Sequence, residues 1–273
     1  MKGVKIVDNI EKLVRERRSF RTFDGREVTA EDREKLCRFI ETIDNLYGIP
    51  VQFKLLEKMS CPVVVGTDLY VGAKIKTVPY LNEAFGYAFE KLVIYAQSLG
   101  IGTVWIGGTM DRAAFERAME LSDNEVMPCV SPLGYPAKKM SFRESMMRKG
   151  IKADERLAFE NIAYRNSFEQ PLTSDEAGKL FLPLEMVRLA PSAVNKQPWR
   201  MIVTDDTVHF YLKRSKNFGG GKLDIQKTDM GIALCHFELM ANELGISTEF
   251  VIDEPDIPCK NEEEYIASFR FRI

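Results

Sequence analysis

Four stretches of this chain have the sequence pattern of an α-helix, with apolar residues every three to four positions or a polar capping residue before them. They cover residues 4–17, 29–44, 82–99 and 112–121. The second begins at Thr29, whose hydroxyl can cap a first turn that contains acidic residues. The third has the densest apolar spacing, which predicts a long, largely buried helix that ends at Gly100.

Shorter apolar runs predict strands, because they are too short for buried helices and are bounded by turn residues. They cover residues 50–59, 61–66 and 201–203, and a further strand is expected to end near residues 133–136. Residues 67–81 carry Gly72 and Pro79 and are predicted to be irregular.

The second half of the chain repeats the order of residues in the first. Arg165-Asn166-Ser167-Phe168 follows Arg17-Arg18-Ser19-Phe20 by 148 residues, Thr173 follows Thr29 by 144, and Leu244-Gly245-Ile246 follows Leu99-Gly100-Ile101 by 145. This nearly constant offset predicts an internal duplication with a boundary near residue 150, between halves 1–150 and 151–273.

The composition is that of a globular protein, with 45% hydrophobic and 29% charged residues. The net charge of −2 gives no reason to expect a nucleic acid or an anionic membrane as partner. Five scattered cysteines and two histidines lack the spacing of a zinc site, so no metal site is predicted. Unpaired thiols, a charged beginning without an apolar signal core and the lack of a membrane-spanning run predict a cytoplasmic protein.

Arginines surround a serine in the segment Arg17-Arg18-Ser19-Phe20-Arg21. Guanidinium groups match phosphate oxygens in geometry and charge, and a serine hydroxyl can donate between them, so the segment fits a phosphate cradle. A solvated basic helix end is the alternative interpretation. A second basic run is interpreted as solvated surface unless an anion lies beside it; it comprises Lys138, Lys139, Arg143, Arg148 and Lys149.

Residues 100–108, Gly-Ile-Gly-Thr-Val-Trp-Ile-Gly-Gly, are rich in glycine, so their backbone can approach a ligand closely. They follow a predicted helix, whereas a dinucleotide-binding glycine loop follows a strand and opens a helix. The stretch is therefore either a helix C-cap with a bulged strand or a ligand-binding loop.

Residues with restricted geometry are concentrated in the stretch Leu189–Trp199, Leu-Ala-Pro-Ser-Ala-Val-Asn-Lys-Gln-Pro-Trp. The residue before each proline is disfavoured in helical backbone, and Asn195 and Gln197 offer amide groups between the two breaks. A plain connector between a helix and a strand needs no such set of residues. We interpret the stretch as a binding loop rather than an ordinary connection.

The two halves differ in complementary ways. Glu169 stands where the first half has Arg21, so the arginine cradle and the Trp-Ile-Gly-Gly sequence survive only in the first half. The Asn-Lys-Gln-Pro-Trp loop survives only in the second. A duplicated two-fold pair that lost parts in this way predicts one composite site per chain.

These motifs resemble those of the nitroreductase family of flavin enzymes, in particular the members with two family-like halves fused in one chain. The matching segments are residues 17–23, 100–108, 133–136 and 191–199. The resemblance implies an α+β fold with mixed, mainly antiparallel sheets flanked by helices, arranged as a pseudo-dimer within one chain that needs no second copy. It also implies FMN as cofactor, bound between the two halves, and NADH or NADPH as hydride donor.

Carried over by position, the resemblance implies that Arg17, Ser19 and Arg21, with Arg18 beside them, hold the phosphate and ribityl chain of FMN. Either Lys139 or Arg143 is expected to add a positive charge near the phosphate; the spacing does not decide between them.

The resemblance also implies the surroundings of the flavin ring. The expected residues are Pro191, Ser192, Ala193 and Asn195, with Gln197 and Trp199 supporting their loop, and the turn of Ile106, Gly107 and Gly108. The backbone N–H of Gly107 is the expected catalytic group, because a donor near flavin N5 stabilises the negative charge of the reduced ring.

The function implied is transfer of hydride from NAD(P)H to a nitro-aromatic, a quinone or a related acceptor, with the flavin supplying the chemistry. A flavin-binding protein without turnover, acting as a carrier, a sensor or a flavin-modifying protein, is the alternative. Ala193 departs from the family pattern, which has a second serine there. Residues 67–81, expected near the substrate, carry no motif that names the acceptor.

Overall fold

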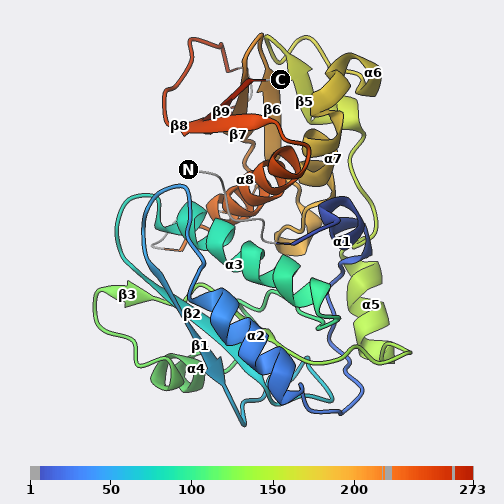
Figure 1. The fold of residues 1–273 in the computed structure, drawn as a ribbon, viewed down its shortest axis with the longest axis vertical. Helices are drawn as coiled ribbons and strands as arrows, with labels where there is room; N and C mark the ends of the chain where they lie inside the picture. Colours follow the sequence, from blue (N-terminus) through green and yellow to red (C-terminus); the bar gives the residue numbers. More distant parts are fainter. Residues whose placement is uncertain (1–6, 217, 219–222, 260–261, 273) are drawn as a thin grey trace. The chain divides into compact units, whose positions relative to one another are not determined.

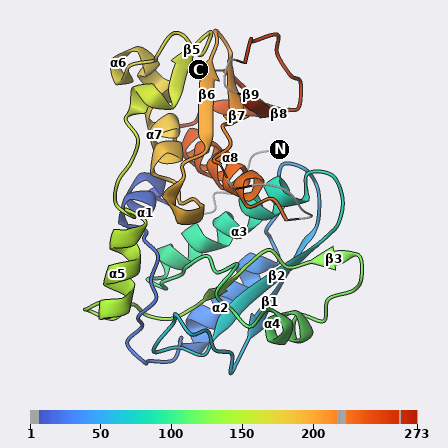
Figure 2. The same cartoon turned by 180° about the vertical axis from the view of Figure 1, so that it is seen from behind.

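The computed structural model describes residues 7–216, 218, 223–259 and 262–272. Contacts within the chain divide it into two units, drawn from opposite sides in Figures 1 and 2. One unit is Glu16–Ala153, and the other combines the residues up to Arg15 with those from Asp154 onward.

A four-stranded antiparallel sheet forms the centre of the unit Glu16–Ala153. Strand β2 (Tyr70–Lys76) pairs with β1 (Val51–Leu56) on one side, and with β3 (Glu125–Val126) and β4 (Val130–Pro132) on the other. Because β2 has neighbours on both sides, nearly all of its residues are buried.

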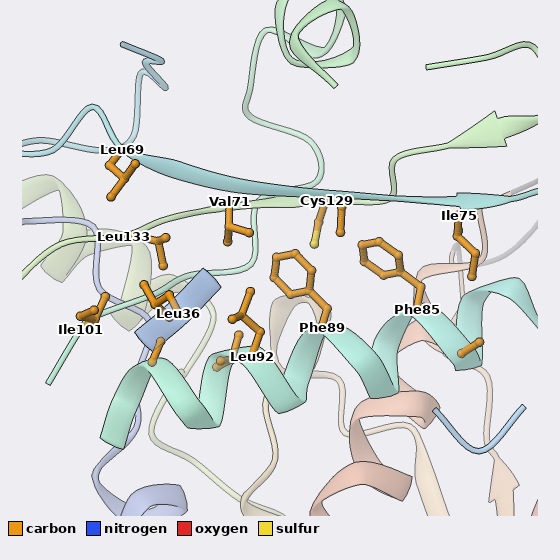
Figure 3. Packing of buried hydrophobic residues seen from close by; sticks show 14 of the residues in the cluster. Leu36, Leu69, Val71, Ile75, Phe85, Phe89, Leu92, Ile101, Cys129 and Leu133 are labelled. Atoms are coloured by element: carbon orange, nitrogen blue, oxygen red, sulfur yellow. The ribbon is translucent and has the colours of Figure 1, made fainter. Parts of the chain in front are cut away.

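The helices α2 (Ala30–Ile40) and α3 (Leu81–Ser98) pack with this sheet around one apolar core. Figure 3 shows Phe85, Phe89 and Leu92 of α3 directed towards the strand that carries Val71 and Ile75. Two shorter helices complete the unit, α4 (Arg112–Ala118) and α5 (Phe142–Gly150).

Two predictions in this unit are wrong: residues 67–81 were expected to be irregular, and residues 61–66 were expected to form a strand. Residues 67–81 contain the central strand β2. Gly72 does not interrupt this strand. A Cβ on Gly72 would lie 2.6 Å from Met119 Sδ, so the glycine leaves room for the Met119 side chain. Residues 61–66 form a turn closed by a hydrogen bond from Val64 N–H to Cys61 O, and only Val65 makes a β-bridge, to Thr22. An apolar run alone does not distinguish a partly buried turn from a strand.

A five-stranded sheet in the order β5-β6-β7-β9-β8 forms the centre of the other unit. Its strands are β5 (Ala163–Arg165), β6 (Trp199–Val203), β7 (Thr207–Leu212), β8 (Ser247–Val251) and β9 (Glu264–Arg272). β5 runs parallel to β6, and all other neighbours are antiparallel.

The helices of this unit are α1 (Ile10–Glu16), α6 (Ser174–Ala177), α7 (Phe181–Leu189) and α8 (Ile225–Glu243). α8 covers the sheet, with Phe237 in ring contact with Phe210 and Phe269. The Glu243 carboxylate accepts hydrogen bonds from the N–H groups of Asn9 and Ile10, and so holds the start of α1. The predicted first helix is thus present from Ile10, and residues 4–6 of that prediction lie outside the described residues.

Both units contain an antiparallel pair of strands followed by a long helix that ends in the same way. Gly100 after α3 and Gly245 after α8 each have φ of +71°, and the next residue, Ile101 or Ile246, donates back to the helix at 2.9 Å. The predicted α+β fold with mainly antiparallel sheets and flanking helices is confirmed. Among the described residues, no helix has the length and apolar character needed to cross a membrane.

The buried His209 makes the stability of the unit that contains residues from Asp154 onward depend on pH. Its Nδ1 lies 2.7 Å from the Ser268 hydroxyl between β7 and β9, and burial lowers its pKa below the usual 6.5, against opposing effects of Asp206 and Asp253. The unfolded chain therefore binds a proton more readily than the folded one, and folding stability should fall as the pH drops below about 6.5.

Denaturant unfolding across this pH window checks the expectation. The His209→Gln variant should lose less stability than the unmodified protein between about pH 7.5 and pH 5.5. Equal losses in the two proteins would contradict the role of His209.

Candidate functional site

Backbone hydrogen bonds bring the sequence motifs of the unit Glu16–Ala153 side by side. The N–H of Phe20 donates to Thr103 O at 2.9 Å, which joins the arginine segment to the glycine-rich stretch. The N–H of Ala137, just after the Leu-Gly-Tyr-Pro sequence, donates to Thr22 O at 3.1 Å. The arginine segment, the glycine-rich stretch and the Leu-Gly-Tyr-Pro sequence are therefore one connected structure.

Two glycines of these motifs are required by this packing. A Cβ on Gly102 would lie 2.9 Å from both the Phe20 ring and the Pro136 ring, and a Cβ on Gly134 would lie 2.8 Å from the Phe23 ring. Gly108 has no atom within 4 Å of such a Cβ. The glycine-rich stretch thus combines a helix cap at Gly100 with a close backbone crossing at Gly102, and only its end is open.

Arg17 and Arg21 lie half-buried in the same place. Burial lowers the pKa of the Arg17 guanidinium, with Glu90 acting against and Arg148 adding to this effect. Burial also lowers the pKa of Arg21, with Glu144 acting against it and Arg148 adding to it. The Nε atoms of both arginines are buried without a hydrogen-bond partner in the part of the chain that the structure describes. These donors call for an acceptor, because a buried unpaired donor costs about 1–3 kcal/mol.

The other members of the arginine segment have different surroundings. Ser19 is half-buried and makes a parallel β-bridge to Thr103. Arg18 is exposed, with its guanidinium carbon 5.3 Å from the centre of the Phe20 ring.

Arg148 is the third basic residue of this group, and sequence reasoning did not select it. It is only 9% exposed and shares the inner face of α5 with Glu144, which accepts a 2.7 Å hydrogen bond from the Thr22 hydroxyl. Lys139 is exposed, and the exposed Arg143 donates to Pro62 O at 2.8 Å. The signal for Arg148 was its spacing of four residues from Glu144, which puts both on one helix face.

The Gly107 N–H points away from the sheet. Ile106 O accepts from Val130 N–H at 2.9 Å. In a trans peptide the next N–H points opposite to that carbonyl, so the N–H of Gly107 is directed away from β4. Gly107 is half-buried, its neighbour Ile106 is buried, and Gly108 is exposed.

Arg112 fixes the following peptide. Its guanidinium donates to Gly107 O at 2.6 Å and to Met127 O at 2.8 Å, and so ties together the two ends of the segment that carries α4. The Gly107 N–H is thus presented from a turn held on both sides.

The loop 191–199 in the other unit is held by its own amide side chains. Asn195 Nδ2 donates to Glu155 O at 3.0 Å, and Gln197 Oε1 accepts from Leu157 N–H at 2.9 Å. Gln197 N–H donates to the Ser192 hydroxyl at 2.8 Å. These bonds support left-handed backbone at Val194, Asn195 and Gln197, with φ of 43°, 56° and 49°. Such conformations cost roughly 1–3 kcal/mol each unless the surroundings impose them.

The front of this loop rests on a buried carboxyl group. Both oxygens of Asp229 lie within hydrogen-bond distance of Ala193 N–H, at 3.0 and 3.2 Å, and burial raises the pKa of Asp229 well above its usual value. Trp199 is fully buried in the core behind the loop. Pro191, Ser192, Ala193 and Asn195 remain half-buried, and Val194 and Lys196 are exposed, so residues 191–196 form the accessible part of the loop.

The chain was compared with known families and structures. The family model described as "Putative TM nitroreductase" matches residues 9–241. A protein of Archaeoglobus fulgidus called "Putative NADH dehydrogenase/NAD(P)H nitroreductase" is 28% identical over an alignment of 159 residues, and the match covers 49% of this chain and 89% of that protein.

Among solved structures, that of a "putative nitroreductase" from Thermotoga maritima covers 96% of this chain and 93% of its own, with 19% identity and a TM-score of 0.63. A "putative nitroreductase in complex with FMN" from Desulfovibrio desulfuricans covers 50% of this chain and 91% of its own, with 19% identity and a TM-score of 0.41.

The class defined by the fold and the motifs is the nitroreductase class. Because the family model spans most of the chain, the chain belongs to the family of the TM nitroreductase. The resemblance inferred from the sequence is confirmed.

The close crossing at Gly102 gives a stability prediction. Gly102→Ala places a methyl group against Phe20 and Pro136 and should destabilise the protein by about 1–3 kcal/mol. Gly108→Ala is the matched control, because its new methyl meets nothing, and it should stay within about 0.5 kcal/mol of the unmodified protein. Chemical denaturation measures both, and equal stabilities of the two variants would contradict the packing role of Gly102.

Proposed function

We propose that this chain is an FMN-dependent oxidoreductase that takes hydride from NADH or NADPH and passes it to a nitro-aromatic, a quinone or a related acceptor. One observation carries the proposal: Arg17 and Arg21 have buried, unpartnered Nε donors in the described structure, beside a third cation, Arg148. Family membership supports the choice of flavin chemistry.

The arginine group fits a phosphate monoester. Arg17, Arg21 and Arg148 carry three positive charges, and the neighbouring Glu90 and Glu144 carry two negative charges. The resulting net charge of +1 attracts an anion, and a phosphate with three terminal oxygens would accept hydrogen bonds from both Nε groups. We assign the phosphate of FMN to these residues, with Ser19 and Arg18 at the margin.

The loop 191–199 is proposed to meet the flavin ring. Its accessible part consists of residues 191–196, and the amide side chains of Asn195 and Gln197 hold the loop in shape. The reciprocal loss of motifs between the halves supports a single site built from both, with one FMN per chain. The half-chain match to the Archaeoglobus fulgidus protein supports the duplication.

When bound, FMN supplies hydride transfer, and the chain's task is to bind, orient and stabilise charge. The Gly107 N–H is the proposed donor near N5, because it points away from the sheet and is held by the bonds of Ile106 and of Arg112. A fixed donor at that place stabilises negative charge without reorganisation.

The absorption spectrum of the purified full-length protein tests this proposal. After reconstitution and gel filtration we expect the flavin absorbance of about one FMN per chain, and rapid bleaching on addition of NADH or NADPH without oxygen. No flavin retention would refute the cofactor assignment. Retained flavin that neither nucleotide bleaches would instead favour a binding protein without turnover.

Arg21 should be essential for FMN affinity. Arg21→Glu replaces a charge-assisted donor by a repelling carboxylate and should weaken FMN binding roughly 100-fold or more. Arg21→Gln, which keeps a polar side chain, should weaken it less. The control is Arg165→Glu, since Arg165 is the counterpart of Arg17 in the other half and is exposed. Flavin fluorescence titration measures all three, and equal affinities would contradict the assignment.

Arg148 should contribute to FMN affinity, whereas Lys139 and Arg143 should not. Arg148→Gln should weaken FMN binding about tenfold or more, because it removes one of the three buried charges. Lys139→Gln and Arg143→Gln should leave the affinity within about twofold, since both side chains are exposed. If Lys139→Gln or Arg143→Gln weakened FMN binding more than Arg148→Gln, the phosphate contact would belong to Lys139 or Arg143, as expected from the sequence.

A further inference from the structure

The outer side of α5 and the residues before it expose large apolar side chains. Phe142 is 82% exposed, Met146 56% and Met140 44%. Phe142 and Met146 are one helical turn apart, on the side of α5 opposite to the buried Glu144 and Arg148. α5 lies at the edge of its unit in both views (Figures 1 and 2).

Free lysines surround these side chains. Lys138, Lys139 and Lys149 are exposed and form no ion pair with any described residue. We call Met140, Phe142 and Met146, together with these three lysines, the α5 patch. It carries no exposed acid, because the only acidic residue between 138 and 152 is the buried Glu144.

The charge of the chain is therefore unevenly distributed. Residues 138–152 contain six lysines and arginines and one glutamate, a net charge of +5, whereas the whole chain has −2. The remaining residues must carry −7. The small overall charge conceals a strongly basic segment.

We propose that the α5 patch binds the surface of an anionic phospholipid membrane, with Phe142 and Met146 inserted among the lipids and the lysines at the headgroups. Basic clusters are attracted to anionic leaflets, and apolar side chains on a basic helix enter the boundary between headgroup and acyl chain. Lysines can keep their charge in water while their stems lie along the apolar layer.

Two features of the patch favour a lipid surface over a protein partner. Lysine is depleted in protein–protein interfaces, whereas it is the usual contact to anionic headgroups. The patch also lacks exposed carboxylates, which a protein interface would use to fix orientation. The proposal extends beyond the proposed function and requires no flavin.

Vesicle sedimentation with the full-length protein tests the proposal. Vesicles of phosphatidylcholine mixed with phosphatidylserine should bind the protein about tenfold or more tightly than vesicles of phosphatidylcholine alone at low ionic strength. Binding should weaken as salt is added, because salt screens the lysine charges.

Two variants and two matched controls locate the surface. Phe142→Ser with Met146→Ser should abolish sedimentation, as should Lys138→Glu with Lys139→Glu and Lys149→Glu. The apolar control is Leu244→Ser with Ile252→Ser, which are 44% and 46% exposed elsewhere. The charge control is Lys58→Glu with Lys76→Glu and Lys179→Glu, which are also exposed. Both controls should keep binding within about twofold, and circular dichroism should show every variant folded.

Several outcomes would overturn the proposal. They are no binding to anionic vesicles, equal binding to both kinds of vesicle, and equal loss of binding in the controls and in the patch variants. Gel filtration tests a further outcome that would overturn it. If Phe142→Ser with Met146→Ser converts a dimer into a monomer, the α5 patch is covered by a second copy of the chain instead of a membrane.

Discussion

Three positive charges, those of Arg17, Arg21 and Arg148, are held together against their own repulsion within the unit Glu16–Ala153. Burial and the charge of Arg148 both lower the pKa of Arg17 and Arg21, so the arrangement is unfavourable for the arginines themselves. The surrounding framework must supply the compensation. It does so through backbone bonds along residues 20–23, through the close crossing at Gly102, and through the carboxylates of Glu90 and Glu144. An anion bound beside these arginines would offset their mutual repulsion.

The sequence predicts those parts of this arrangement that depend on local order. The α3 helix follows from its apolar spacing, and Arg17, Ser19 and Arg21 stand out because they are neighbours in the chain. Arg148 does not stand out, because it lies more than a hundred residues away and becomes a neighbour only when α5 folds with Glu144 inward. The position of a charge that is distant in sequence depends on tertiary packing. The spacing of Glu144 and Arg148 shows only that they share one face of a helix.

The errors in the predicted strands have the same origin. Gly72 interrupts the apolar pattern of a strand in the sequence. In the folded protein a glycine is required there, because Met119 occupies the space where a side chain would be. Residues 61–66 have the apolar character of a strand, yet they form a turn in which only Cys61 and Val63 are buried. The charge balance was misleading in a related way. A net value of −2 averages a basic segment with an acidic remainder. The sequence shows the basic run, and the structure adds that Lys138, Lys139 and Lys149 in it are exposed.

The contact between α1 and α8 sets an order of events during synthesis. Asn9 and Ile10 donate to Glu243, which is made 234 residues after Asn9. At the usual rate of elongation, about 5–20 residues per second, the first helix waits on the order of ten to fifty seconds for its partner. Until residues beyond Ala153 are made, Ile10, Leu13 and Val14 have no apolar surface of their own unit to cover them. The unit that combines residues up to Arg15 with those from Asp154 onward can close only after Glu243 has been made, whereas Glu16–Ala153 can fold before that.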